Sequence, residues 1–171
     1  MVGKGLLNFL GGTLGVAIII GFFLPWISLS TDNVLPIPLK INQKLLQNAQ
    51  FSFEISGFDI VNTAAKSQVK PIISFAKMFV KNAEKLDQKV YLLYLIPIFG
   101  FIVTFFSFKG VENLVYHFLA LLISGGIFGW GMYQILTQKS TLQFEIGIGL
   151  WMILFSMFLI FLVSFVNMVK K

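Results

Sequence analysis

The chain has 171 residues, of which 57% are hydrophobic and 12% are charged, about half the charged share of an ordinary soluble domain. It contains no cysteine and a single histidine, His117, so disulfides, thiolate nucleophiles, iron–sulfur clusters and multi-histidine metal sites within one chain are excluded. The net charge is +6, but all 13 cations are lysines, and arginine, the usual reader of bases and phosphates, is absent. We therefore predict no nucleic-acid partner, and nothing in the sequence indicates a cofactor or a metal.

Four long apolar stretches dominate the chain, at about residues 5–29, 90–108, 114–136 and 146–168. A helix needs about 20 apolar residues to cross the hydrocarbon core of a bilayer, and each stretch meets or approaches that length. The first is longer than the apolar region of a signal peptide and ends without an Ala-x-Ala pattern, so we expect it to be retained as a span. These features predict an all-α integral membrane protein, in which residues 1–171 form one membrane domain built on a four-helix transmembrane bundle.

The lysines and the aromatic residues indicate how these spans are oriented. The two tails and the second loop carry Lys4, Lys109, Lys170 and Lys171, whereas the third loop carries Lys139. Because short positively charged loops tend to stay in the cytoplasm, both termini are expected there. Trp and Tyr concentrate at membrane interfaces, and the following residues fall toward the opposite, outer face: Trp26, Tyr91, Tyr94, Trp130, Tyr133 and Trp151.

Two spans carry glycines that favour close packing of helices. Gly11 and Gly15 have G-x-x-x-G spacing in the first span, and Gly125 and Gly129 have it in the third. The favoured interpretation is packing within the monomer, and the alternative is a glycine face that docks a partner subunit. In the second span, Pro97 removes a backbone donor and predicts a kink, with a gating hinge as the less favoured interpretation.

The segment 30–89, between the first two spans, is predicted to form a small α+β unit outside the membrane. Alternation of apolar and polar residues at 27–30 and 51–56, and a weaker alternation at 37–41, indicates two or three short antiparallel strands. Ser56 followed three residues later by Asp59 matches a capping box, which predicts a short helix that ends near Lys66.

A second, amphipathic helix is expected from Pro71 to about residue 89, because apolar residues recur there at intervals of three and four. Lysines repeat every four residues on another face: Lys77, Lys81, Lys85 and Lys89. The helix is interpreted either as packed on the sheet with its lysines in solvent, or as lying on anionic headgroups or an acidic partner. We expect Phe58 and this lysine face to make the outer contacts.

In its layout, the chain resembles the claudin-like four-span proteins, whose first outer segment is a small sheet with a short helix. The resemblance rests on the order of a span, strands with Trp26 just outside the membrane, a helix and three closely connected spans. The family's Gly-Leu-Trp motif and two loop cysteines are absent, so no pore or junction residue is carried over. Leu24-Pro25-Trp26 and Ser56-Gly57-Phe58-Asp59 also resemble stretches of small uncharacterised bacterial four-helix membrane proteins, which implies a bacterial inner membrane and no particular activity.

The spans lack deeply placed charged residues, which are the usual marks of ion paths and proton relays. We therefore predict a non-enzymatic membrane scaffold or accessory subunit, whose partners are the lipid bilayer and other membrane subunits or a second copy. The alternative is a small channel or transporter formed by oligomerisation. Glu54, Asp59 and His117 are the best acid–base candidates for an enzyme, but the topology places His117 on the other side of the membrane, so no catalytic residue is assigned.

Overall fold

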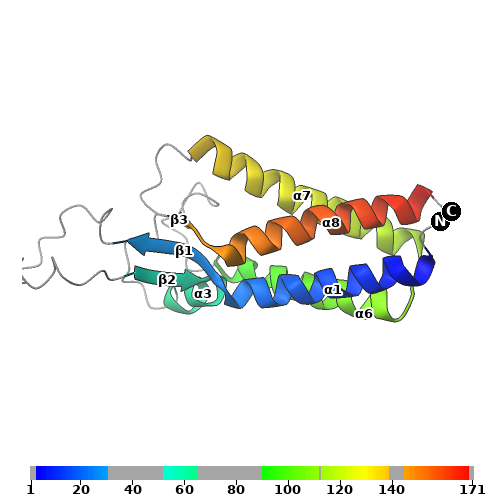
Figure 1. Cartoon of the computed structure of the whole chain (residues 1–171), viewed down its shortest axis with the longest axis horizontal. Helices are drawn as coiled ribbons and strands as arrows, with labels where there is room; N and C mark the ends of the chain where they lie inside the picture. The colour runs from blue at the N-terminus through cyan, green and yellow to red at the C-terminus, as the bar shows by residue number, and fades with distance from the viewer. Residues whose placement is uncertain (1–2, 31–51, 65–89, 112, 139–144, 170–171) are drawn as a thin grey trace, which may run out of the picture.

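The computed structural model of this chain describes residues 3–30, 52–64, 90–111, 113–138 and 145–169. Four of its helices are long and apolar enough to cross a membrane, and a three-stranded sheet and a short helix lie at one end of them (Figure 1). In chain order the elements are α1 (Lys4–Phe23), β1 (Pro25–Ser30), β2 (Ser52–Ser56), α3 (Gly57–Ala64), the 3-10 helix η3 (Val90–Tyr94), α6 (Leu95–Phe108), α7 (Leu114–Gln138), β3 (Glu145–Ile146) and α8 (Ile148–Val169). The prediction of four apolar helices with a small sheet is therefore confirmed, and the length and composition of these helices make the chain a candidate multi-pass membrane protein.

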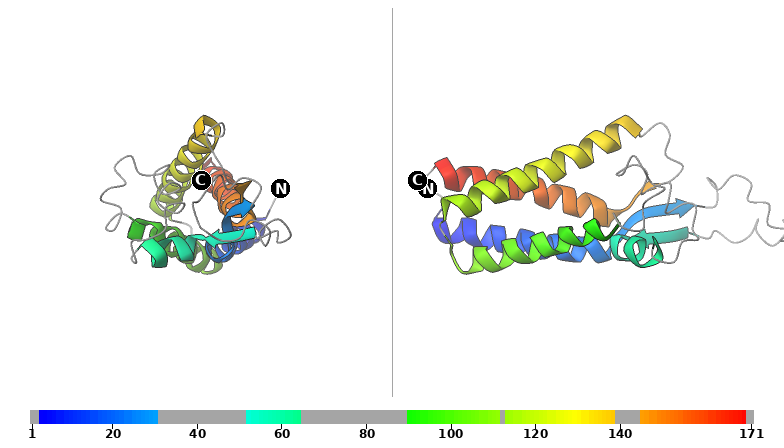
Figure 2. Two further views of the ribbon diagram at one scale, coloured as in Figure 1. Left: turned by 90° about the vertical axis from the view of Figure 1, so that its left-hand side faces the viewer. Right: turned by 180° about the vertical axis from the view of Figure 1, so that it is seen from behind.

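The four long helices pack side by side in the order α6, α1, α8, α7. Helix α1 contacts both α6 and α8, and α7 packs mainly on α8, as the end-on view of Figure 2 shows. Helices α6 and α7 are consecutive in the sequence, yet they stand at the two ends of this series. Helix α7 also diverges from the others toward the end that carries the sheet, while α1 begins and α8 ends at the opposite end (Figure 1).

Helix α1 ends at Phe23, whereas the first apolar stretch was predicted to span the membrane as far as Leu29. Leu24 is extended, with φ −81° and ψ 159°, because the ring of Pro25 disfavours helical geometry in the residue before it. The chain then continues directly into β1. The last residues of the apolar stretch therefore belong to the sheet, as their period-two pattern had indicated.

Pro97 is the third residue of α6 and lies in its first turn. Backbone N–H groups in the first turn have no acceptor within the helix, so a proline there interrupts no α-helical hydrogen bond. Just before Pro97 the helix changes type, from the 3-10 helix η3 to α6, and the kink predicted at this proline stays a prediction.

Strand β1 is the centre of the sheet and pairs antiparallel with both β2 and β3. Ile27 faces Ile55 on one side and Ile146 on the other. The sequence analysis had assigned residue 146 to the fourth span, because a strand of two residues leaves no periodic signal. Next to β3, the backbone N–H of Gly147 donates to the carbonyl oxygen of Trp26 at 2.8 Å, which joins the start of α8 to β1.

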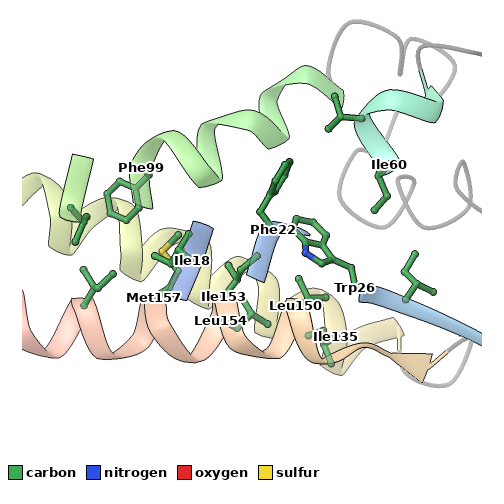
Figure 3. Packing of buried hydrophobic residues seen from close by; sticks show 14 of the residues in the cluster. Ile18, Phe22, Trp26, Ile60, Phe99, Ile135, Leu150, Ile153, Leu154 and Met157 are labelled. Atoms are coloured by element: carbon green, nitrogen blue, oxygen red, sulfur yellow. The ribbon is translucent and has the colours of Figure 1, made fainter. Parts of the chain in front are cut away.

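Trp26 connects the sheet to the helical bundle (Figure 3). Its side chain is 2% exposed, its indole N–H donates to the carbonyl oxygen of Gly21 at 2.9 Å, and its ring meets Phe22 edge-on at 5.9 Å. A Cβ at Gly57 would lie 2.5 Å from the Cζ2 atom of this indole, so the first residue of α3 needs to be glycine. One continuous apolar core runs through the bundle and the sheet, and it includes Ile18, Phe22, Ile27, Ile55, Ile60, Ile153 and Met157.

Candidate functional site

Gly11 and Gly15 lie where α1 approaches α6 most closely. A Cβ on Gly15 would be 2.6 Å from the carbonyl oxygen of Gly100, and a Cβ on Gly11 would be 2.7 Å from the hydroxyl oxygen of Ser107. In return, a Cβ on Gly100 would be 2.8 Å from the carbonyl oxygen of Gly15. These two glycines are therefore occupied by contacts within the chain and leave no free face for a partner.

The glycines of α7 divide between two faces of the helix. A Cβ on Gly125 would lie 3.0 Å from the ring of Phe161 in α8, and one on Gly131 would lie 2.6 Å from Leu154. Gly129, which was expected to share the packing face of Gly125, has nothing within 4 Å, and the same holds for Gly126. The side of α7 that contacts α8 therefore carries Gly125 and Gly131, whereas Gly126 and Gly129 lie on the outward side.

The predicted interfacial aromatics gather at the end of the bundle that carries the sheet. Four of them are about half exposed, namely Tyr91, Trp130, Tyr133 and Trp151. Tyr94 is partly buried, with its ring 5.8 Å from that of Phe22. Trp26 is buried in the core, so it stabilises the junction of sheet and bundle rather than presenting its ring to headgroups.

Of the residues expected to make contacts outside the membrane, the structure describes Phe58 but not the lysine face. Phe58 is exposed in the first turn of α3, and its ring packs 5.4 Å from that of Phe23 at the end of α1. The amphipathic helix expected from Pro71, with Lys77, Lys81, Lys85 and Lys89, lies outside the described residues, as does the strand expected at 37–41.

The capping box that begins α3 is confirmed. The backbone N–H of Ser56 donates to the Oδ2 carboxylate oxygen of Asp59 at 3.0 Å, and the Ser56 hydroxyl donates to the same oxygen at 2.6 Å. The backbone N–H of Asp59 donates back to the Ser56 hydroxyl oxygen at 3.1 Å. This reciprocal pair fixes the junction between β2 and α3, and so the position of Phe58 against α1.

A small polar hollow lies at the opposite end of the bundle, among the first turns of α1 and α7 and the last turns of α6 and α8. Its polar lining comes from all four helices: Asn8, Ser107, Tyr116, His117, Ser164 and Asn167. The turn between α6 and α7 shapes this end. Gly110 has φ 64°, a left-handed conformation that favours glycine, and the side chain of Asn113 accepts a hydrogen bond from the backbone N–H of Val115 at 3.0 Å.

Tyr116 joins α6 to α7 beside this hollow. Its hydroxyl lies 3.3 Å from that of Ser107 and donates to the carbonyl oxygen of Val103 at 3.4 Å. His117 is 7% exposed, and its ring centroid is 5.0 Å from that of Tyr116. The lone histidine of the chain is therefore buried where the helices converge, although the sequence suggested only that it lay near the inner interface.

The three acid–base candidates do not meet in one site. Glu54 and Asp59 lie in β2 and α3 at the sheet end, whereas His117 lies in the first turn of α7 at the other end (Figure 1). Among the residues that the structure describes, no group of three or more His, Cys, Asp or Glu side chains is placed to hold a metal ion.

The hollow could not be predicted from the sequence, because its polar members are single residues in four different helices. Ser164 and Asn167 are three residues apart, which places them on one face of α8, and this spacing was a usable signal. Asn8 and Ser107, however, become neighbours of that face only through the packing order of the helices. No protein family, curated protein or solved structure shows a significant match to this chain.

Proposed function

We propose that this chain is a non-enzymatic scaffold or accessory subunit of a larger membrane complex. The observation that carries the proposal is the outward face of α7, where Gly126 and Gly129 have open space around them. In lipid, helices associate through van der Waals contact, and glycines allow their backbones to approach closely. The contact of Gly11 and Gly15 with α6 is an example of such a face, already occupied, in this same molecule.

The packing order of the helices supports this use of α7. Since α7 stands at the end of the series and packs mainly on α8, the rest of its surface is available to lipid or to another helix. Leu122, Trp130 and Tyr133 are about half exposed on the outward side and flank the two glycines. A partner helix placed there would cover the glycines and contact these large side chains.

The orientation that we propose follows from charge and aromatic placement. The end with the sheet and the exposed aromatics faces outward, and the end with the two termini faces the cytoplasm of a bacterial cell. In this orientation Phe58 and the outer α+β unit are available to a second contact with the partner, outside the membrane. The proposal retains the layout of the claudin-like proteins but uses none of their functional residues.

The test is co-purification of the tagged full-length chain from its native membranes in mild detergent, followed by mass spectrometry. We expect a partner subunit, or a second copy of this chain, that is retained by the wild type and lost when Gly126→Ile and Gly129→Ile are combined. Gly5→Ile is the matched control, because Gly5 is a helical glycine that also has nothing within 4 Å. Equal recovery of the partner with all three proteins, or a wild type that purifies alone, would rule out this role for α7.

A further inference from the structure

The polar hollow at the end opposite the sheet is large enough for one small molecule. The space open to the centre of a water molecule is about 10 Å³, and that is close to the volume a single water requires. Leu7, Gly11, Val103, Val111, Ile160 and Val163 complete the lining between the polar side chains. The hollow therefore combines a fitting size with hydrogen-bonding groups, whereas a dry cavity is lined by apolar groups alone.

Ser164 is the group in this hollow that most needs a hydrogen-bond partner. Its side chain is 3% exposed, and its hydroxyl makes no hydrogen bond with any other described residue. Among the described residues, every fully enclosed side-chain oxygen and nitrogen has a partner. Ser164 is one of the residues that line the hollow, so a molecule held there lies beside it.

The other helices place polar groups around the same space. Asn8 of α1 and Asn167 of α8 are half-buried, and each carries an amide that both donates and accepts hydrogen bonds. His117 of α7 is more than nine-tenths buried and lies in the same lining. The lining therefore offers hydroxyl, amide and imidazole groups to a molecule in the hollow, and such groups are the usual partners of a buried water.

We infer that one ordered water molecule occupies this hollow and links Ser164 of α8 to polar groups of α1 and α7. The hydroxyl and amide groups of the described lining suit a water molecule, whereas hard cations prefer charged oxygen ligands. The water would satisfy the Ser164 hydroxyl and connect α8 to α1 and α7. This inference is independent of the proposed partner site on α7.

The test is X-ray hydroxyl-radical footprinting of the full-length protein in detergent, since radicals form from the water molecules that lie next to a side chain. The probe is water itself, supplied as H₂¹⁸O so that the incorporated oxygen is identified by mass. We expect His117 to be oxidised several-fold faster than Met157. Met157 is an oxidisable thioether with 0% exposure in the apolar core, so it reports background labelling away from water.

Two variants separate a bound water from general accessibility. Ser164→Val removes the hydroxyl and fills the space, so we expect oxidation of His117 to fall several-fold. Ser156→Val is the matched control, because Ser156 is also 3% exposed in α8 but does not line the hollow. Ser164→Ala serves as a smaller change if the valine variant does not fold. The inference is overturned if wild-type His117 is labelled no faster than Met157, or if Ser164→Val lowers its labelling no more than Ser156→Val does.

Discussion

The close approach of α1 and α6 makes Gly15→Ala the most informative substitution for the fold. The new Cβ would lie 2.6 Å from the carbonyl oxygen of Gly100, about 0.8 Å short of the 3.4 Å at which ordinary contact begins. The obstacle is backbone, which has no alternative rotamer, so the two helices must separate. A gap of about 0.5–1 Å already forfeits a quarter to a half of the dispersion energy of each contact across it.

The expected cost follows from two opposing effects. Overpacking of a close contact typically costs about 1–3 kcal/mol, and the better helix propensity of alanine offsets up to about 1 kcal/mol of this. We therefore expect Gly15→Ala to lower the free energy of unfolding by up to about 2 kcal/mol, and by about 1–3 kcal/mol relative to Gly129→Ala, which gains the helix propensity without the close contact. The measurement is unfolding in mixed micelles of mild detergent and SDS, followed by tryptophan fluorescence. Gly129→Ala is the control, with no loss expected because its surroundings are open.

A double variant tests the reasoning more severely. Gly100→Ala should also be destabilising, since its Cβ would lie 2.8 Å from the carbonyl oxygen of Gly15. One separation of the helices relieves both clashes, so the double variant should lose less stability than the sum of the two single variants. A Gly15→Ala protein as stable as Gly129→Ala would refute the close packing of α1 and α6, and strictly additive losses would refute the shared separation.

Three further outcomes are expected from the rest of the molecule. Trp26→Ala should cost about 3–5 kcal/mol, because it empties a fully buried site, whereas Trp130→Ala, at an exposed ring, should change stability little in the same unfolding assay. Asp59→Ala should destabilise the protein by about 1 kcal/mol through loss of the capping box, and Glu54→Ala, which removes an exposed carboxylate, should not. Because the chain has no cysteine, Glu54→Cys and Asn113→Cys each provide a unique labelling site, one at each end of the bundle. An impermeant maleimide applied to intact spheroplasts should label the cysteine at position 54 and spare the one at position 113. Labelling of both to the same extent would contradict the proposed orientation.

Local patterns were strong enough to predict the elements that depend on neighbours in the sequence. The period-two segment after α1 forms β1, and Ser56 with Asp59 begins α3, because a strand face and a helix cap are each specified within a few residues. The two-residue strand β3 was missed, since its pairing with β1 comes from a segment more than 100 residues earlier in the chain.

Apolar length and the scarcity of charge by themselves determined that four helices of this chain can cross a membrane, since hydrocarbon leaves a backbone few alternatives to hydrogen bonding within its own helix. They could not determine which faces of those helices meet, because in lipid nearly every face is apolar and the hydrophobic pattern no longer marks the interior. Only the tertiary structure decided that Gly15 is used within the chain while Gly129 is left open, and that single polar residues from four helices converge near His117. Those choices depend on backbone approach at distances of a few ångströms, which spacing along one helix does not contain.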